Sequence, residues 1–402
     1  MRITTHILAA LPVLLSFQAA AAPHHVVRET RVLYPLAVGQ LELTDTIVQD
    51  GPLAINRFRM HRLRRTGFPA QGAVLLLPSL GNSFQGYLFD EQGEITRSFA
   101  ANLARAGYEV WGYSPRETGI TAAACGVTLD CTPALDWSIQ TVIDDATYIR
   151  SRIKQVFPTR DPVIGGLSLG AISAIAVVNQ YPRDYAGLLA WEGSPVSDDP
   201  AVIAHNTPFC NAYSGMVAGG IAVDNQNLPF VKTLAALART APNDPFVLPV
   251  PGFPPGLTNV QAFVLVLSAP NPVAPSPRPG FITAAGDFLS GQLFYSEKRR
   301  IMAAIAVFND VTANRVSRDY YCSLAGVETA YTSKLSRFRA PVLLIKAGQG
   351  FGAIMDELAN KVSSPSVTRI GIHAYGHIDH LGSPLHGLQL EAPIVFWLNA
   401  VL

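Results

Sequence analysis

The chain has 402 residues, of which 49% are hydrophobic and 15% are charged. That length allows one large domain with an insertion, or two domains. The 30 basic and 29 acidic residues give a formal net charge of +1. The composition therefore gives no electrostatic reason to expect a nucleic-acid partner.

The N-terminus has the layout of a secretory signal peptide. A charged start at Met1 and Arg2 is followed by an apolar run from Ile7 to Phe17 and then by the small residues of "QAAAAP". This apolar run is too short to span a membrane, and no later run is long enough to do so convincingly. We predict a signal peptide over residues 1–22, no integral membrane segment, and a secreted or periplasmic protein. The alternative is an apolar N-terminal helix packed on the domain.

Four cysteines follow the predicted signal peptide: Cys125, Cys131, Cys210 and Cys322. An even number in an exported chain indicates two disulfides, although spacing does not determine the pairing. Pairing Cys125 with Cys131 would close a local loop, and pairing Cys210 with Cys322 would tie down a long segment. The alternative is four free, buried thiols. No CxxC pair is present, so a zinc site built on cysteines is not expected.

The first predicted strands, "LELTDTIVQD" (41–50) and "LAINRFRMHRL" (53–63), alternate apolar and polar residues, as half-exposed antiparallel strands do. The pattern then changes. "AVLLLP" (73–78) is continuously apolar, which favours a strand covered on both faces, and a helix ending at Gly107 follows it. The same alternation of strand and helix repeats along the next eighty residues. The strands are "YEVWGY" (108–113), "PVIGGL" (162–167) and "GLLAWE" (187–192), and the helices lie near 139–153 and 170–181.

This alternation predicts an α/β fold, a mostly parallel sheet with helices on both faces. It stops between residues 196 and 339, where Pro-rich stretches flank one short apolar helix candidate. It resumes with "PVLLIKAG" (341–348), a helix near 352–362, a strand at 366–373 and a closing helix. We predict a core of residues 23–195 and 340–402 and an inserted cap of residues 196–339, because so long a structureless loop is improbable. An independent second domain is the alternative.

"GGLSLG" places Ser168 directly after a buried strand and before a helix. A serine there sits in a sharp turn that needs small neighbours, and its hydroxyl projects toward a substrate. Ser168 is therefore the candidate nucleophile.

At this motif the sequence resembles the α/β-hydrolase superfamily, over most of the exported chain except the cap. Locally it is similar to the acid-lipase branch. The segment "FAANLARAGYEVWGYSPRETG" (99–119) looks like the helix, strand and Arg-containing turn of those lipases, and "YGHIDHLGS" (375–383) looks like their histidine loop. The resemblance implies an α/β-hydrolase fold and serine-hydrolase chemistry.

A serine hydroxyl needs a base to act as a nucleophile. His377 follows the last predicted strand, in the position and chain order that the superfamily uses for that base. His373 is expected at the strand end and His380 in the following turn. A zinc site made by these histidines is less favoured, because Gly376 interrupts the helix that ligands at i and i+4 need.

An oxyanion hole needs two backbone N–H donors. Leu169, the residue after the nucleophile, is one candidate. Leu80 matches the position of the second donor in the superfamily, but the His-Gly that normally precedes it is absent. Ser79 could instead contribute its hydroxyl.

The histidine also needs a carboxylate. The turn that usually supplies it contains only Gly348, Gln349, Gly350, Phe351 and Gly352. Glu192 is favoured because a carboxylate at the end of a buried strand is costly unless it is paired. The position also looks like that of the acid in certain haloalkane dehalogenases. Asp356 is expected to face water and Asp379 to brace its loop, but both stay candidates.

These residues predict a carboxylic ester hydrolase, an esterase or lipase-like enzyme, that acts through an acyl-enzyme without a metal or organic cofactor. The Pro- and Phe-containing cap favours an apolar pocket for a small-molecule or lipid-like ester. A peptidase or amidase with the same triad, or a non-catalytic binding protein, remains open. Acyl chain length and oligomeric state are not determined by the sequence.

Overall fold

The computed structural model describes residues 24–88, 94–248, 250, 252–269, 283, 287 and 289–402. The predicted signal peptide lies outside the described residues, as does most of the second Pro-rich stretch. Within the part that is described, no helix combines the length and the apolar character needed to cross a bilayer.

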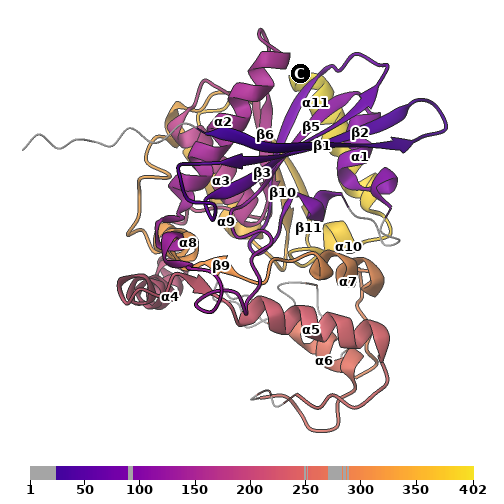
Figure 1. Cartoon of the computed structure of the whole chain (residues 1–402), viewed down its shortest axis with the longest axis vertical. Coiled ribbons are helices and arrows are strands. Elements are labelled where there is room, and N and C mark those ends of the chain that lie inside the picture. The colour runs from indigo at the N-terminus through magenta and orange to yellow at the C-terminus, as the bar shows by residue number, and fades with distance from the viewer. Residues whose placement is uncertain are drawn as a thin grey trace, which may run out of the picture.

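A nine-stranded sheet forms the centre of the molecule, in the order β1-β2-β3-β5-β4-β6-β7-β10-β11 (Figure 1). β1, β2 and β3 pair antiparallel, and β3 pairs antiparallel with β5. All further pairs are parallel. The strands are β1 (His25–Pro35), β2 (Gln40–Gln49), β3 (Arg57–Thr66), β4 (Gly72–Leu77), β5 (Tyr108–Ser114), β6 (Val163–Leu167), β7 (Gly187–Trp191), β10 (Val342–Ala347) and β11 (Val367–Ile372).

Helices cover both faces of this sheet, as the alternation predicted. α2 (Ile139–Val156), α3 (Leu169–Gln180) and α9 (Gly352–Lys361) contribute to the hydrophobic cluster on one face. α1 (Phe99–Arg105) and α11 (Ala392–Val401) contribute to the cluster on the other. β4, β5, β6 and β7 are buried along their whole length, which explains their continuously apolar sequences. The predicted α/β class is confirmed.

β1 was not predicted from the sequence. Most of its residues are exposed, with Arg28, Glu29 and Arg31 among them, and it pairs only with β2 at the edge of the sheet. A strand that buries almost no side chains lacks the apolar signal on which strand prediction depends.

The segment between β7 and β10 contains several helices, although only one helix was predicted in it. It contains α4 (Pro200–Ala218), α5 (Asn227–Thr240), α6 (Asn259–Leu267), α7 (Lys298–Ala306) and α8 (Asn314–Leu324), together with a short sheet of β8 (Val223–Asp224) and β9 (Thr312–Ala313). α6 is the predicted apolar helix. α5, α6 and α7 pack around a hydrophobic cluster of their own. Figure 1 shows α4, α5 and α6 at the opposite end of the molecule from the C-terminus.

We call residues 196–339 the insertion, and its boundaries stay a prediction. The remaining short elements are α10 (Asp379–Gly382), the 3-10 turns at Phe84–Tyr87, Ile95–Arg97, Thr132–Asp136 and Leu335–Arg337, and a π-helical turn at Gly387–Glu391.

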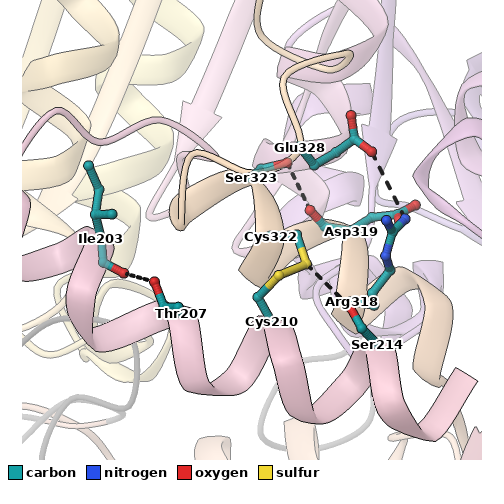
Figure 2. Close-up of a disulfide and its surroundings, with 9 residues drawn as sticks. All are labelled: Ile203, Thr207, Cys210, Ser214, Arg318, Asp319, Cys322, Ser323 and Glu328. Atoms are coloured by element: carbon teal, nitrogen blue, oxygen red, sulfur yellow. Dashed lines mark hydrogen bonds and ion pairs between the residues drawn. A yellow bond between two sulfur atoms is a disulfide. The ribbon is translucent and has the colours of Figure 1, made fainter. Parts of the chain in front are cut away.

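The structure contains both disulfides, Cys125–Cys131 and Cys210–Cys322. Figure 2 shows the second one joining α4 to α8. α4 buries only Val202, Asn206 and Cys210, and its Phe209 and Tyr213 stack on Tyr321 of α8. The disulfide adds a covalent link between the two helices. With so few buried apolar residues, α4 has no clear hydrophobic periodicity, which explains why the sequence did not predict this helix.

Candidate active site

Ser168 lies in a strained turn between β6 and α3. Its φ of 58° and ψ of −121° are unusual for any residue other than glycine. The flanking glycines are required by close contacts. A Cβ at Gly166 would lie 2.2 Å from the carbonyl oxygen of Leu77, and one at Gly170 would lie 1.9 Å from it. The sequence therefore folds here into the sharp strand-turn-helix that its small residues predicted.

Glu192 occupies the equivalent place at the end of the neighbouring strand, β7. Its φ is 50°, and it and Ser168 are the two non-glycine residues with positive φ in the described part of the chain. Leu167 pairs with Trp191, and the Ser168 N–H donates to the Trp191 carbonyl at 2.8 Å. Parallel pairing therefore brings both strained residues to one edge of the sheet, and such strain clusters at functional sites.

The Glu192 carboxylate is fully buried and accepts hydrogen bonds on both oxygens. The Ala347 N–H donates to Oε1, the Phe351 N–H donates to Oε2 at 3.0 Å, and Nδ1 of His377 lies 3.2 Å from Oε2. The two amides hold the carboxylate in place at this buried position. Glu192 is thus the acidic side chain that contacts His377.

The Gly-rich turn after β10 leaves room for this contact. A Cβ at Gly350 would lie 2.0 Å from Oε2 of Glu192, and one at Gly348 would lie 2.3 Å from the His373 carbonyl oxygen. A side chain at Gly350 would displace the carboxylate. The glycines of this turn therefore make room for the Glu192 carboxylate and for the backbone at His373.

Asp356 pairs with basic side chains near the surface. Its side chain is 48% exposed and forms ion pairs with Lys346 and Arg369. The expectation that it faces water agrees with this position.

Asp379 is buried and braces the histidine loop. Its Oδ2 accepts a hydrogen bond from the Gly376 N–H at 2.7 Å, and its Oδ1 accepts one from the hydroxyl of Ser296 in the insertion. Asp379 therefore links the loop that carries His377 to the insertion.

His377 itself is nearly buried, and its ring packs against Phe351 with centroids 5.2 Å apart. His373 directly follows β11, as predicted, and His380 lies in the short helix α10. Burial, with a smaller contribution from His377, lowers the pKa of His380 to about 4, so its ring is neutral at pH 7. Among the described residues, no three His, Cys, Asp or Glu side chains gather as metal ligands would.

The two predicted oxyanion donors lie on different elements. Leu169 is the first residue of α3, where a helix N–H has no partner within the helix. Leu80 lies in the turn after β4, which is closed by a hydrogen bond from the Asn82 N–H to the Ser79 carbonyl. Asn309 in the insertion also binds this turn, through its N–H to the Gly81 carbonyl at 2.6 Å and its side chain to the Asn82 carbonyl.

Sequence analysis did not identify Asn309 or Ser296. Each contacts a loop far away in the chain, 227 residues away for Asn309 and Asn82 and 83 for Ser296 and Asp379. No local sequence pattern predicts a contact between residues so far apart in the chain. The only local indication was the short distance in sequence between Asp379 and His377.

No protein-family model and no curated protein matches the sequence. Solved structures do match. A Sulfolobus solfataricus protein, described provisionally as a lipase, is 19% identical with a TM-score of 0.65, over 92% of this chain and 99% of that one. A thermostable carboxyl esterase from Bacillus coagulans is 12% identical with a TM-score of 0.51, over 93% and 98%. These matches show that the chain has the α/β-hydrolase fold. At such identities they do not assign an activity.

Proposed function

We propose that this protein is a serine hydrolase that cleaves carboxylic esters, with Ser168 as nucleophile, His377 as general base and Glu192 as the acid that orients it. The observation that carries the proposal is the buried contact between Glu192 and His377 at the strand end next to Ser168. A carboxylate held by two backbone amides and facing an imidazole is the arrangement that activates a serine.

The proposed mechanism gives the two ring nitrogens of His377 different roles. With Nδ1–H donating to Glu192, Nε2 is free of its proton and can accept the one from Ser168 as the hydroxyl attacks the ester carbonyl. The Ser168 oxygen bonds to the carbonyl carbon, and negative charge develops on the carbonyl oxygen. The Glu192 carboxylate stabilises the imidazolium that forms.

The N–H groups of Leu169 and Leu80 are the proposed donors to that oxyanion. Collapse of the intermediate expels the alcohol, which takes the proton from His377, and leaves an ester on Ser168. A water molecule, deprotonated by His377, then attacks the acyl-enzyme and releases the acid.

The proposal is tested on purified protein with p-nitrophenyl esters of graded acyl length and one p-nitroanilide. We expect hydrolysis of the esters, and Ser168→Ala should lower it by several orders of magnitude while the protein stays folded. Ser194→Ala, which removes a different buried serine hydroxyl, is the matched control and should remain active.

A fluorophosphonate probe gives an independent test. It should label wild type at Ser168 and leave Ser168→Ala unlabelled. Substantial ester hydrolysis by Ser168→Ala would refute the serine-hydrolase proposal. Anilide cleavage at the same rate as the esters would favour the amidase alternative.

We also propose that the protein is exported from the cytoplasm. Two disulfides support it, because they persist in oxidising compartments, and so does the signal-like pattern over residues 1–22. N-terminal sequencing of the mature protein should place cleavage near Ala21 or Ala22. Thiol titration under denaturing, non-reducing conditions should find no free thiol, and finding four would contradict export with disulfide formation.

A further inference from the structure

A second buried carboxyl lies close to the candidate active site. Glu117 follows β5 and is 7% exposed, and its side chain lines a pocket of about 30 Å³. The same pocket is lined by Ser79 and Gly81 of the turn after β4, and by Leu169 and Ser173 of α3. The pocket therefore adjoins both elements that carry the proposed oxyanion donors.

The size of the pocket limits what it can accept. A water molecule needs roughly 10–15 Å³ of such cavity volume, so the pocket holds about two groups of the size of water. Leu77, Trp137 and Val316 provide apolar walls, while Ser138 and Thr141 at the start of α2 add hydroxyls. A group of two heavy atoms that carries one polar atom matches this lining.

Glu117 shares its pocket with Arg116, whose guanidinium is bound by two other carboxylates. The neighbouring Arg116 donates from Nη2 to Asp145 at 2.7 Å and to Asp50 at 2.9 Å, and from Nε to Asp145 at 3.2 Å. Within the described residues, Glu117 makes no ion pair and no side-chain hydrogen bond to another residue. The carboxyl therefore has acceptor capacity that no other side chain uses, and a ligand with a hydroxyl group can supply a donor for it.

The ionisation of Glu117 fits this position. Burial raises the pKa of Glu117 to about 7, with a further contribution from Asp145, against the opposing effects of its own backbone amide and Arg116. In either protonation state, a carboxyl oxygen can accept a hydrogen bond from a hydroxyl group.

We propose that Glu117 is a specificity-determining residue, whose carboxyl accepts a hydrogen bond from a hydroxyl on a short acyl group. The preferred substrates would then be esters of small hydroxy acids. This rests on the proposed function, since it assigns the pocket beside the oxyanion donors to the acyl side of an ester. A pocket of this size can hold only the first one or two atoms of the acyl chain beyond the ester carbonyl carbon.

The test compares p-nitrophenyl glycolate with p-nitrophenyl propionate, which differ by a hydroxyl in place of a methyl group of similar size. Each kcat/KM is divided by the rate constant of the ester's alkaline hydrolysis, to remove the difference in intrinsic reactivity. A buried hydrogen bond to a carboxyl should favour the glycolate by about 10- to 100-fold in wild type. A corrected ratio near one in wild type would overturn the proposal without any variant.

Variants test whether Glu117 causes the preference for the glycolate. Glu117→Leu removes the acceptor and should bring the ratio close to one, while Glu117→Gln keeps an acceptor oxygen and should stay within a few-fold of wild type. Asp50→Asn is the matched control, because Asp50 contacts Arg116 but does not line the pocket, and it should keep the wild-type ratio. Thermal unfolding confirms that each variant is folded.

The outcomes separate the two proposals. Hydrolysis of neither ester by wild type would refute the proposed function. Two other results would refute the role of Glu117 but not the proposed function. In the first, wild type hydrolyses both esters and Glu117→Leu retains the preference for the glycolate. In the second, Asp50→Asn abolishes the preference as fully as Glu117→Leu does.

Discussion

Two buried carboxylates, Glu192 and Asp145, have different main hydrogen-bond partners. Glu192 is bound by two backbone amides and a histidine. Asp145 is bound by the Arg116 guanidinium through both oxygens, by the Tyr113 hydroxyl at 3.1 Å, and by His24 at 3.4 Å. Both side chains are completely buried.

The difference lies in what each partner can do. An arginine stays protonated at any accessible pH, so the pairing of Arg116 with Asp145 is suited to holding elements together. A histidine can gain and lose a proton, so the Glu192 site can take part in proton transfer. The comparison predicts that removing charge at Glu192 affects turnover, whereas removing it at Asp145 affects folding.

The largest expected effect is on turnover. Glu192→Gln keeps the shape but removes the charge that stabilises the imidazolium, so kcat should fall by roughly 10²- to 10⁴-fold. Asp356→Asn is the control and should stay within a few-fold of wild type, because Asp356 pairs with Lys346 near the surface. The reverse ranking, with both variants folded, would show that the orienting acid lies after β10.

Asp145→Asn should instead lower the free energy of unfolding. It leaves the buried Arg116 partly unpaired, and breaking a buried ion pair costs about 3–5 kcal/mol. Urea unfolding measures this loss, and kcat per folded molecule should change by no more than a few-fold. Replacing both partners, with Arg116→Met and Asp145→Leu, should recover part of the stability. A loss of turnover without a loss of stability would contradict the assigned roles.

The same contrast extends to two histidines and predicts a pH effect. The hydrogen bond to Asp145 raises the pKa of His24, whereas burial lowers the pKa of His380 to about 4. Between pH 6.5 and 4 the unfolded chain binds a proton at residue 380 that the folded protein does not bind. The stability contributed by neutral His380 is therefore present above pH 6.5 and is lost as the pH falls.

His380→Leu should remove this contribution to acid sensitivity. Between pH 7 and pH 5, the variant should lose about 2 kcal/mol less unfolding free energy than wild type. His61, whose pKa burial also lowers to about 4, remains in the variant, so part of the pH dependence should persist. Parallel urea titrations at the two pH values measure the difference, and equal losses in both proteins would refute it.

The smallest expected effect tests the link between the insertion and the histidine loop. Ser296→Ala removes the hydroxyl that donates to Asp379, which should loosen the loop and lower kcat by a few-fold. The global free energy of unfolding should fall by only about 1 kcal/mol. Thr207→Ala is the control, because its hydroxyl bonds within α4 at 2.8 Å (Figure 2). An equal effect of the two changes on kcat would show that the contact does not position His377.

Much of the core was predictable because its signals are local. The buried stripe of α2, Ile139, Val142, Ala146, Ile149 and Ile153, was identified from periodicity and is buried in the structure. The insertion was harder to predict, since α4 buries few residues and is joined to α8 by a disulfide. Its Cys210 bonds to a residue 112 positions later, and periodicity carries no information at that distance.

The candidate site divides in the same way. Sequence patterns selected Ser168, His377 and Glu192 as a set but did not determine which carboxylate meets the histidine. Asp356 and Asp379 were open alternatives. In the structure, Asp356 pairs with Lys346 and Arg369. Asp379 accepts hydrogen bonds from Gly376 and Ser296. Those three residues keep their catalytic roles as proposals.

By itself, the sequence determined the features that depend on neighbouring residues. The turn at Ser168 follows from small residues between a buried strand and a helix, and the parallel sheet follows from alternating strand and helix patterns. Tertiary structure alone decided the contact between Glu192 and His377, the binding of the Leu80 turn by Asn309, and the pocket at Glu117. These need atoms from distant segments within a few ångströms of each other, and strand order and packing set that proximity.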